Sequence, residues 1–406
     1  MSLCINPQCK NPINSDTIIF CHGCGSELLL DGRYRVIREL GQGGFGITYE
    51  IISVNSRPWV LKVLMDNHPK YVELFQQEAQ VLSILNHSGI PKIDLDGYFL
   101  YFPRGAEEPL HCLVMEKIEG LNLSEYIKQR GDRPIQLKRA LRWLAELTLI
   151  LEQVHKENFF HRDIKPSNIM LRANGCLALI DFGTARELTN SYIQKKAAGE
   201  ITGVMTQGYT PMEQMRGKAV LQSDFYALGG TMIYLLTAQN PSDFYHSLSD
   251  KMVWRDAVPG ISDEFADLID RMMAFSPANR PSSSREIFNQ VIAIDSSLQI
   301  LDEHFNSASF TSTITSTTGT RVNQTSANSA SLSNTRLFSS SDCPLSPEFI
   351  ERCRQELAEF IGPMANIVCK RTVKQNPHMS ESELSAALAK TIANPQQAKD
   401  FRQRLR

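Results

Sequence analysis

A glycine-rich run near the start of the chain is the first pattern that could do chemistry. Residues 41–46 read GQGGFG. Glycines are needed where backbone N–H groups must approach phosphate oxygens closely, although dinucleotide-binding folds and plain hairpins use them too. Apolar alternation precedes the run, and Thr48 and Tyr49 continue as a strand, which predicts the order strand, glycine turn, strand. A dinucleotide-binding turn opens a helix, so the second strand argues against that interpretation.

Two charged residues interrupt apolar patterns downstream of the glycine run. Lys62 stands within the apolar strand expected over residues 59–64, and Glu78 follows sixteen residues later on a pattern of helical spacing. Taken singly, each charge is more often part of a solvated surface. The alternative is that the lysine directs a cation at a ligand.

The N-terminal cysteines are spaced like metal ligands. Cys4 and Cys9 precede the pair Cys21 and Cys24, and together they resemble a small zinc ribbon with a CxxC knuckle. Four thiolates complete the tetrahedral shell of a structural Zn²⁺ site. A segment this short has no core to fold without a metal, so we favour zinc over four reduced surface cysteines. His22, between the knuckle cysteines, is expected to be a bystander.

The overall composition excludes several classes of protein. A net charge of −2 with 21% charged residues gives no sign of a nucleic-acid or anionic-membrane partner. No apolar run approaches the ~20 residues that span a bilayer, and the start of the chain lacks the apolar core of a signal peptide. We therefore expect a cytoplasmic protein, and a reducing cytoplasm disfavours disulfides among its nine cysteines.

Composition also divides the chain into four expected regions. Ser and Thr make up 19 of the 37 residues from 306 to 342, a composition that cannot bury enough apolar surface to fold. That stretch is expected to be a disordered linker between folded parts. The expected regions are a cysteine-bearing module over 1–28, a long mixed α/β domain over 31–295, the linker over 296–345 and a helical accessory domain over 346–406.

The last region carries three signals for the start of a helix. A proline follows both Ser346 and Asn394, and Ser380 is followed three residues later by Glu383, as in a capping box. With apolar residues at helical spacing after each signal, the region is predicted to be a small helical bundle. Its basic residues would dock an acidic protein partner, or simply form a solvated helix face.

Two motifs in the long middle region decide its interpretation. Residues 161–168 read HRDIKPSN and residues 179–183 read LIDFG. Together with the glycine run, in this order and spacing, they resemble the Hanks-type protein kinases over roughly residues 33–292. The resemblance implies an α+β class with a bilobal protein-kinase fold, an N-terminal zinc ribbon and a small C-terminal all-α domain. A ribbon placed before such a domain is similar to the arrangement in cyanobacterial multi-domain serine/threonine kinases.

The resemblance implies a role for each polar residue of the two motifs. Asp163 would accept or orient the proton of the acceptor hydroxyl, while Asn168 and Asp181 would hold Mg²⁺ or Mn²⁺. Lys165, two residues after Asp163, matches the serine/threonine class and not the tyrosine class. Phosphoryl transfer needs positioning and neutralisation of developing negative charge, and these groups would supply both.

The resemblance also implies an ATP site. Lys62 would contact the α- and β-phosphates while paired with Glu78. Residues 113–120 resemble the hinge between the lobes, although a buried strand that ends in a glycine turn would read the same. Backbone groups of Glu116 and Ile118 would read adenine, behind Met115 as gatekeeper. The implied ATP-binding residues are Leu40, Gly41, Gly43, Gly44, Phe45, Gly46, Thr48, Lys62, Met115, Glu116 and Ile118.

Three further residues match structural positions of the family. Glu213 closes a segment in which the family usually reads Ala-Pro-Glu, and Arg280 would be its buried ion-pair partner. Asp224 resembles the aspartate at a helix start that braces the catalytic loop. Because the segment here reads Pro-Met-Glu, with Met212 before the glutamate, activity should be intact but substrate selection is less certain.

Regulation is implied by residues around the expected base. Arg162 precedes Asp163 and would pair with a phosphate that orders the activation segment. Thr202 is the leading phosphosite, because it lies at the expected distance before Glu213. Thr206 matches the threonine that contacts the base and should contact Asp163 and Lys165 instead.

The sequence thus predicts a serine/threonine kinase that phosphorylates proteins, autophosphorylates and acts in signalling. One alternative is a binding protein whose ribbon engages nucleic acid on a degenerate kinase scaffold, but such a scaffold usually loses Lys62, Asp163 or Asp181. A small-molecule phosphotransferase is disfavoured by the long segment between Asp181 and Glu213. The ribbon itself would be a redox switch for the nearby lobe, or would only cap that lobe or recruit a substrate.

Overall fold

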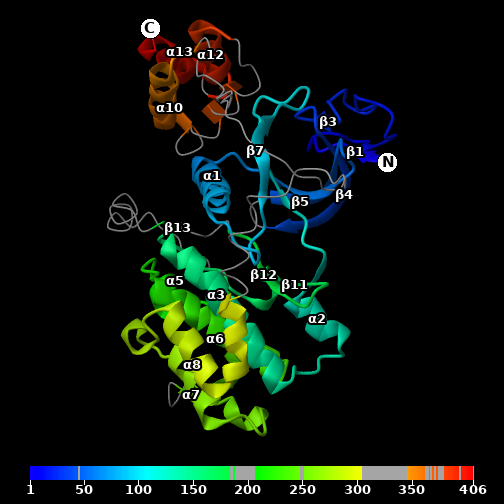
Figure 1. Cartoon of the computed structure of the whole chain (residues 1–406). Helices are drawn as coiled ribbons and strands as arrows, with labels where there is room; N and C mark the ends of the chain where they lie inside the picture. The colour runs from blue at the N-terminus through cyan, green and yellow to red at the C-terminus, as the bar shows by residue number, and fades with distance from the viewer. Residues whose placement is uncertain are drawn as a thin grey trace, which may run out of the picture. The chain divides into compact units, whose positions relative to one another are not determined.

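The computed structural model of the chain divides into two compact units, Met1–Ser309 and Phe310–Arg406, both of which are traced in Figure 1. The structure describes residues 1–43, 46–182, 186–187, 206–246, 251–303, 345–361, 365, 368–369, 372–373, 379–392 and 395–405.

A six-stranded antiparallel sheet forms the N-terminal lobe of the first unit. Its order is β3-β4-β5-β6-β8-β7, so most neighbours in space are also neighbours in sequence. Side chains alternate between the faces of a strand, and one face buries an apolar core that includes Val36, Ile51, Leu61 and Cys112. The strands are β3 (Leu29–Leu30), β4 (Tyr34–Gly43), β5 (Gly46–Ser53), β6 (Pro58–Leu64), β7 (Ile93–Tyr101) and β8 (Leu110–Glu116).

One long helix packs on this sheet. α1 (Pro69–Ile84) follows β6 in the chain and contacts β6, β7 and β8. Proline suits the first position of a helix, because the N–H that it lacks would have no partner within the helix there. It buries Phe75, Glu78, Ala79, Val81 and Leu82, so a carboxylate enters an otherwise apolar face.

The cysteine-bearing start joins the core of the same lobe. β1 (Ser2–Leu3) pairs with β2 (Ile13–Asn14), and Ile5, 3% exposed, lies in the apolar cluster formed by the sheet. The Tyr101 hydroxyl donates to the carbonyl of Glu27 at 2.6 Å. Figure 1 shows β1 and β3 beside β4 at one end of the sheet. The ribbon is therefore continuous with the lobe and not a separate bead on the chain.

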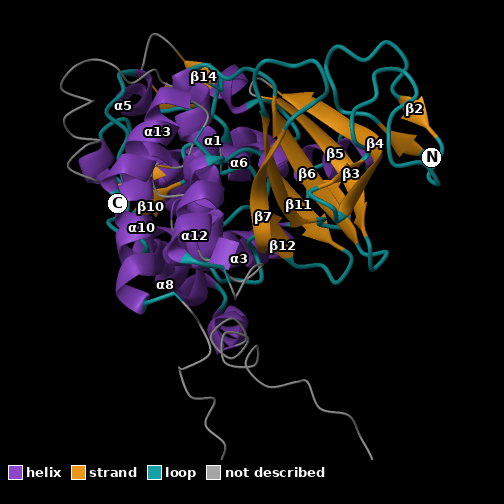
Figure 2. Cartoon of the chain, turned by 90° about the horizontal axis from the view of Figure 1, so that it is seen from above, coloured by secondary structure: helices purple, strands orange, loops and turns teal. Residues whose placement is uncertain are grey.

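The other lobe of the first unit is mainly helical. α3 (Leu137–Lys156) is buried along most of its length and packs against α6 and α8. Figure 2 shows these helices set apart from the strands of the N-terminal lobe. The small sheet β12-β11-β9 adjoins both polar motifs, because residues 161–168 directly precede β11 and Asp181 follows β12. The helices are α2 (Leu123–Gln129), α3, α5 (Met212–Met215), α6 (Leu221–Thr237), α7 (Asp263–Met272) and α8 (Ser284–Ile294). The strands are β9 (Gly120–Asn122), β10 (Phe159–Phe160), β11 (Ile169–Arg172), β12 (Leu177–Leu179), β13 (Arg186–Glu187), β14 (Tyr245–His246) and β15 (Lys251–Met252).

The second unit is helical in the residues that the structure describes. Its named helices are α10 (Pro347–Ile361), α12 (Glu381–Ala389) and α13 (Pro395–Arg404), which begin at the three expected start signals. Ser380 and Glu383 form the capping box that the sequence predicts. The helices enclose an apolar core that includes Cys353, Leu357 and Phe401.

The α+β fold class is confirmed, with a β-sheet lobe, a helical lobe, an N-terminal cysteine cluster and C-terminal helices. Among the described residues, no helix is both long and apolar enough to cross a bilayer.

Candidate active site

A lysine on the sheet is held by two carboxylates from distant parts of the chain. Lys62 on β6 places its Nζ 2.7 Å from Oε2 of Glu78 on α1 and 2.9 Å from Oδ1 of Asp181, which follows β12. Burial opposes the charged form of Lys62, but Asp181 and Glu78 outweigh it and raise the pKa of the ammonium above its ordinary value. Lys62 therefore stays a cation, and the exposed side chain of Asp181 lies within its reach.

The carboxylate of Asp163 is surrounded by donors. Lys165 Nζ and Asn168 Nδ2 lie 2.7 and 2.9 Å from its Oδ2. The Thr206 hydroxyl donates to the other oxygen, Oδ1, at 3.1 Å. Carboxylate oxygens accept hydrogen bonds, so these donors fix the orientation of the Asp163 side chain.

The loop that carries Asp163 is braced by a buried aspartate of α6. Asp224 accepts hydrogen bonds at 2.8 Å from the backbone N–H groups of both His161 and Arg162. Arg162 has a left-handed backbone with φ of 70°, which a side-chain-bearing residue adopts only when its surroundings impose it. Gln214 Nε2 donates to the Arg162 carbonyl at 2.6 Å and holds the same peptide from the other side.

His161 links this loop to the segment of Asp181. Its Nε2 lies 3.1 Å from the Ile180 carbonyl, and its ring meets Phe182 edge to face at 4.7 Å. Burial lowers the pKa of His161, so the ring is neutral and its Nε2 donates to the carbonyl. The two polar motifs are thereby packed into one site.

Glu213 and Arg280 form a bidentate ion pair. The Arg280 side chain is fully buried, with Nη1 2.6 Å and Nη2 3.2 Å from the two carboxylate oxygens. Further donors reach the carbonyls of Ala274, Gln222 and Phe275. Because every face of the guanidinium has a partner, the pair can anchor the segment after Thr206 to the helical lobe.

Comparison with known proteins identifies this arrangement. The family model described as "Protein kinase domain" matches residues 34–292. The chain belongs to the protein kinase family. It is 32% identical over 305 residues to serine/threonine-protein kinase B of Synechocystis sp., covering 71% of this chain and 51% of that protein. It is 38% identical over 275 residues to serine/threonine-protein kinase PknA of Nostoc sp., covering 64% of this chain and 47% of that protein.

A further relative and a second family model complete the comparison. Serine/threonine-protein kinase F of Synechocystis sp. is 32% identical over 317 residues, which cover 70% of this chain and 62% of the relative. The chain thus spans about half to three fifths of the curated relatives it matches. Residues 348–406 match a domain of unknown function. Hanks-type cyanobacterial kinases are therefore its relatives, as the motifs predict.

The kinase domain implies ATP and Mg²⁺ or Mn²⁺, and the described residues suit them. Asn168 and Asp181 offer an amide and a carboxylate oxygen, which are hard ligands that Mg²⁺ accepts. A Cβ on Gly46 would lie 2.0 Å from the Val63 carbonyl, so only glycine lets β5 and β6 pair there. Leu40, Gly41, Gly43, Gly46 and Thr48 lie on β4 and β5 as expected, whereas Gly44 and Phe45 lie outside the described residues.

Glu116 and Lys117, in the segment expected to form the hinge, make ion pairs with both lobes that the motifs did not predict. The Glu116 carboxylate lies 2.8 Å from Arg172 of β11. Lys117 binds Glu50 of β5 at 2.9 Å. Met115 and Ile118 are buried on either side of these charges. Neither partner was singled out in the sequence, because Arg172 lies 56 residues from Glu116, Glu50 lies 67 residues from Lys117, and neither belongs to a motif.

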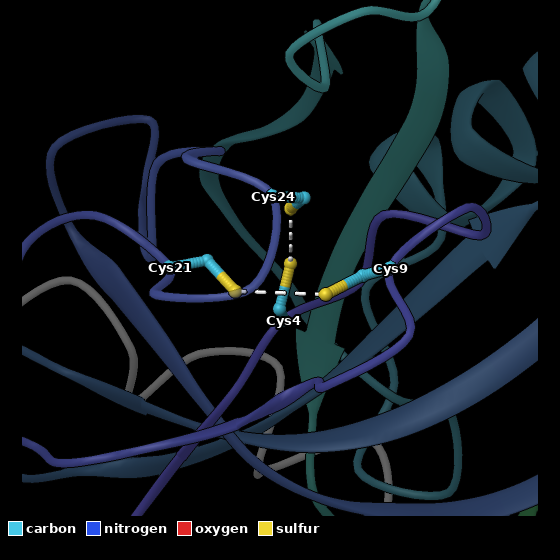
Figure 3. Close-up of side chains that lie close together, drawn as sticks. All are labelled: Cys4, Cys9, Cys21 and Cys24. Carbon is cyan, nitrogen blue, oxygen red and sulfur yellow. Dashed lines mark hydrogen bonds between the residues drawn. The ribbon is translucent and has the colours of Figure 1, made fainter.

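The four N-terminal cysteines converge on one point, as Figure 3 shows. The Cys4 and Cys24 sulfurs are 3.6 Å apart, as are those of Cys9 and Cys21, and all four lie within 4.8 Å of one another. Zn–S bonds of about 2.3 Å at tetrahedral angles place sulfurs about 3.8 Å apart, so the cluster fits zinc.

Polar groups support the cysteine cluster from outside. Asn14 Nδ2 lies 3.4 Å from the Cys21 sulfur, and the Ser26 hydroxyl lies 3.2 Å from that of Cys24. Donors to thiolates are usual around structural zinc. Neither residue could be found from cysteine spacing.

Of the two expected regulatory threonines, only Thr206 lies within the described residues. Thr206 contacts Asp163 at 3.1 Å, and among the described residues it makes no hydrogen bond to Lys165. Thr202 lies outside the described residues, which end at 187 and resume at 206.

Proposed function

We propose that the chain is a serine/threonine protein kinase that transfers the γ-phosphate of ATP to Ser and Thr hydroxyls of proteins. The observation that carries the proposal is the complete Lys62–Glu78 pair together with Asp163 held by Lys165, Asn168 and Thr206. The names of the relatives, all serine/threonine-protein kinases, support the same class of acceptor. Autophosphorylation and a role in signalling belong to this proposal.

The residues divide the work of phosphoryl transfer between them. Asp163 orients the acceptor hydroxyl and takes up its proton, since three donors hold its carboxylate in one orientation. Lys165, beside it, neutralises charge that develops on the transferred group. Lys62 holds the α- and β-phosphates, and Glu78 keeps it extended. Asn168 and Asp181 hold Mg²⁺, which supplies further neutralisation of the phosphates.

The proposal extends to the parts of the chain around the kinase domain. The cysteine cluster binds structural Zn²⁺, and residues 1–28, 31–295, 296–345 and 346–406 serve as ribbon, kinase domain, linker and accessory domain. The accessory domain engages a protein partner of unknown identity, and the protein acts in the cytoplasm. Thr202 is the activation-segment phosphosite and pairs with Arg162 when phosphorylated.

The decisive experiment measures phosphate transfer by variants of the full chain. Asp163→Ala and Lys62→Ala should each lower transfer from Mg-ATP to casein and to the chain itself at least about 100-fold. Lys138→Ala, an exposed lysine of α3, is the matched control and should keep wild-type activity. Circular dichroism should show all three folded. Wild-type rates in either site variant would refute the assignment and favour a scaffold that only binds.

Phosphopeptide mapping identifies the acceptors. Phosphate should appear on Ser and Thr, with Thr202 among the sites of autophosphorylation. If Thr202→Ala keeps full activity while phosphate maps elsewhere, the proposed phosphosite is wrong.

A further inference from the structure

A buried polar contact joins β7, β8 and α1 on the side of the sheet opposite the ribbon. The Tyr98 hydroxyl lies 2.5 Å from Nδ1 of His111. Both residues are buried, with exposed fractions of 5% for Tyr98 and 7% for His111. Their strand neighbours Phe99 and Cys112 belong to the core on the other face. Because side chains alternate along a strand, Tyr98 and His111 face α1.

The contact extends to the helix itself. Gln76 Nε2 lies 3.4 Å from the Tyr98 hydroxyl, and the Phe75 and Tyr98 rings meet at 6.2 Å. Gln76 stands two residues before Glu78, within the same turn of α1. Tyr98 thus connects β7 and β8 to the turn of α1 that carries Glu78, the partner of Lys62.

The protonation states of Tyr98 and His111 decide which of them donates the hydrogen bond. Burial lowers the pKa of His111 to about 4, so its ring is neutral and one nitrogen accepts. Burial raises the pKa of Tyr98 well above its ordinary value, so its hydroxyl keeps a proton to donate. Tyr98 therefore donates to His111 and accepts from Gln76. A buried hydroxyl with both kinds of partner specifies one arrangement of its neighbours.

The start of α1 also contacts the β7–β8 hairpin. Its N-cap, His68, accepts from the Lys70 N–H at a long 3.4 Å, and α1 has no acidic residue in its first turn and no basic residue in its last. Just before this cap, Asn67 Nδ2 donates to the carbonyl of Pro109, the residue before β8, at 2.7 Å. The β7–β8 hairpin therefore holds α1 at two points.

We propose that Tyr98 and His111 are positioning residues that hold α1 where Glu78 binds Lys62, and so set the fraction of molecules competent for phosphoryl transfer. The inference rests on the proposed kinase function, because it is the Lys62–Glu78 pair that the contact serves. Neither residue touches the phosphates; both act through the helix.

A matched pair of variants separates this role from general support of the hairpin. Tyr98→Phe removes one hydroxyl and keeps the ring, and should lower kcat/KM for casein about fivefold, the effect of one lost hydrogen bond. Tyr101→Phe removes an equally buried hydroxyl from the same strand, whose partner is Glu27 in the ribbon. It should leave kcat/KM within twofold of wild type. Equal losses in the two variants would overturn the proposal.

The acceptor gives an independent check by conservative rescue. His111→Leu should reproduce the loss seen in Tyr98→Phe, because the tyrosine then donates to nothing. His111→Asn keeps an acceptor near the position of Nδ1 and should keep kcat/KM within twofold of wild type. A fivefold loss in His111→Asn, or none in His111→Leu, would count against the hydrogen bond as the positioning contact.

A double-mutant cycle tests whether Tyr98 acts through Glu78. In a Glu78→Gln background, whose residual rate is the reference, Tyr98→Phe should have no further effect. The same fivefold loss in both backgrounds would show a route that bypasses Glu78, and the proposal would fall.

The last measurement does not require activity. Amide hydrogen exchange within Pro69–Ile84 should be about fivefold faster in Tyr98→Phe than in wild type or Tyr101→Phe. If wild-type protein transfers no phosphate but this change is seen, the kinase function fails and the positioning of α1 stands. If transfer is normal and exchange is unchanged, the positioning inference alone fails.

Discussion

Asp163 shows what individual side chains do in this site. Each of its carboxylate oxygens has a partner, and those partners come from the loop itself and from Thr206, 43 residues along the chain. A base must be aimed as well as ionised, since a displacement of about 1 Å can cost a large part of the rate. The segment that carries Thr206 therefore bears on the base directly.

Replacing Thr206 tests this contact. Thr206→Val keeps the shape but removes the hydroxyl that donates to Asp163, so kcat should fall about tenfold with little change in KM for ATP. Thr206→Ser retains the donor and should keep most of the activity. Steady-state kinetics on the two proteins decide the matter, and an unimpaired valine variant would exclude Thr206 from aiming the base.

His111 makes stability depend on pH. Burial lowers its pKa from 6.5 to about 4, so the unfolded chain takes up a proton as pH falls below 6.5 while the folded chain does not. Its stabilising contribution is complete above pH 6.5 and is lost between 6.5 and about 4, by up to about 3 kcal/mol. His87, whose pKa burial lowers in the same way, adds a second such contribution.

Urea unfolding at about pH 7 and about pH 5 measures the effect. Wild type should be less stable at the lower pH, and His111→Asn should lose part of this dependence, because burial lowers the pKa of His87 and His161 as well. An unchanged dependence in His111→Asn would mean that His111 titrates alike in both states.

At the scale of elements, close packing of backbones decides where glycine is required. β9 pairs with β11 in antiparallel fashion, and Gly120 lies opposite Arg172. Gly120 has φ of 140°, and a Cβ there would lie 1.9 Å from the Leu171 carbonyl. β9 can pair with β11 at this position only because Gly120 has no side chain.

Gly120→Ala should therefore destabilise the kinase domain by at least about 3 kcal/mol, since backbone must move as well as φ. Gly131→Ala is the control: its φ of 69° is also left-handed, but nothing lies within 4 Å of the added Cβ. That variant should cost only about 1 kcal/mol. Thermal unfolding compares them, and equal losses would show that backbone strain, not the clash, governs both sites.

At the scale of the first unit, the ribbon belongs to the N-terminal lobe. Ile5 completes the apolar cluster of the sheet, Arg35 donates to the Ile18 carbonyl at 2.8 Å, and Ser26 accepts from the Arg104 N–H at 2.9 Å. These contacts hold only while the ribbon keeps its fold. In a module without a core of its own, folding and metal binding are one equilibrium.

On the proposal that the cluster binds Zn²⁺, removing the metal should destabilise the lobe and not only the ribbon. A zinc chelator should lower the melting temperature of wild type by at least about 5 °C. Cys21→Ser with Cys24→Ser should start from the lower value and no longer respond, whereas Cys176→Ser, outside the cluster, should behave as wild type. Differential scanning fluorimetry with zinc analysis provides the measurement. A chelator that extracts zinc without changing the melting temperature would separate the ribbon from the lobe.

Local patterns were sufficient for much of this protein. The strands on either side of the glycine run and the helices that begin at Glu381 and Pro395 all depend on residues within a few positions of each other. The conformational freedom of glycine, side-chain caps and hydrophobic periodicity act over a few residues, so the sequence alone can predict their effects. Spacing alone likewise grouped the four cysteines.

Only the tertiary structure decided which distant groups meet. Gln214 at the Arg162 carbonyl, Arg172 at Glu116, and the pair of Tyr98 and His111 each join segments whose separation leaves no local pattern. Ile5 reads in the sequence as an ordinary apolar residue, and its place in the sheet core depends on how the whole lobe closes. Burial and charge pairing are properties of the assembled chain, because a side chain loses its water only when other elements pack over it.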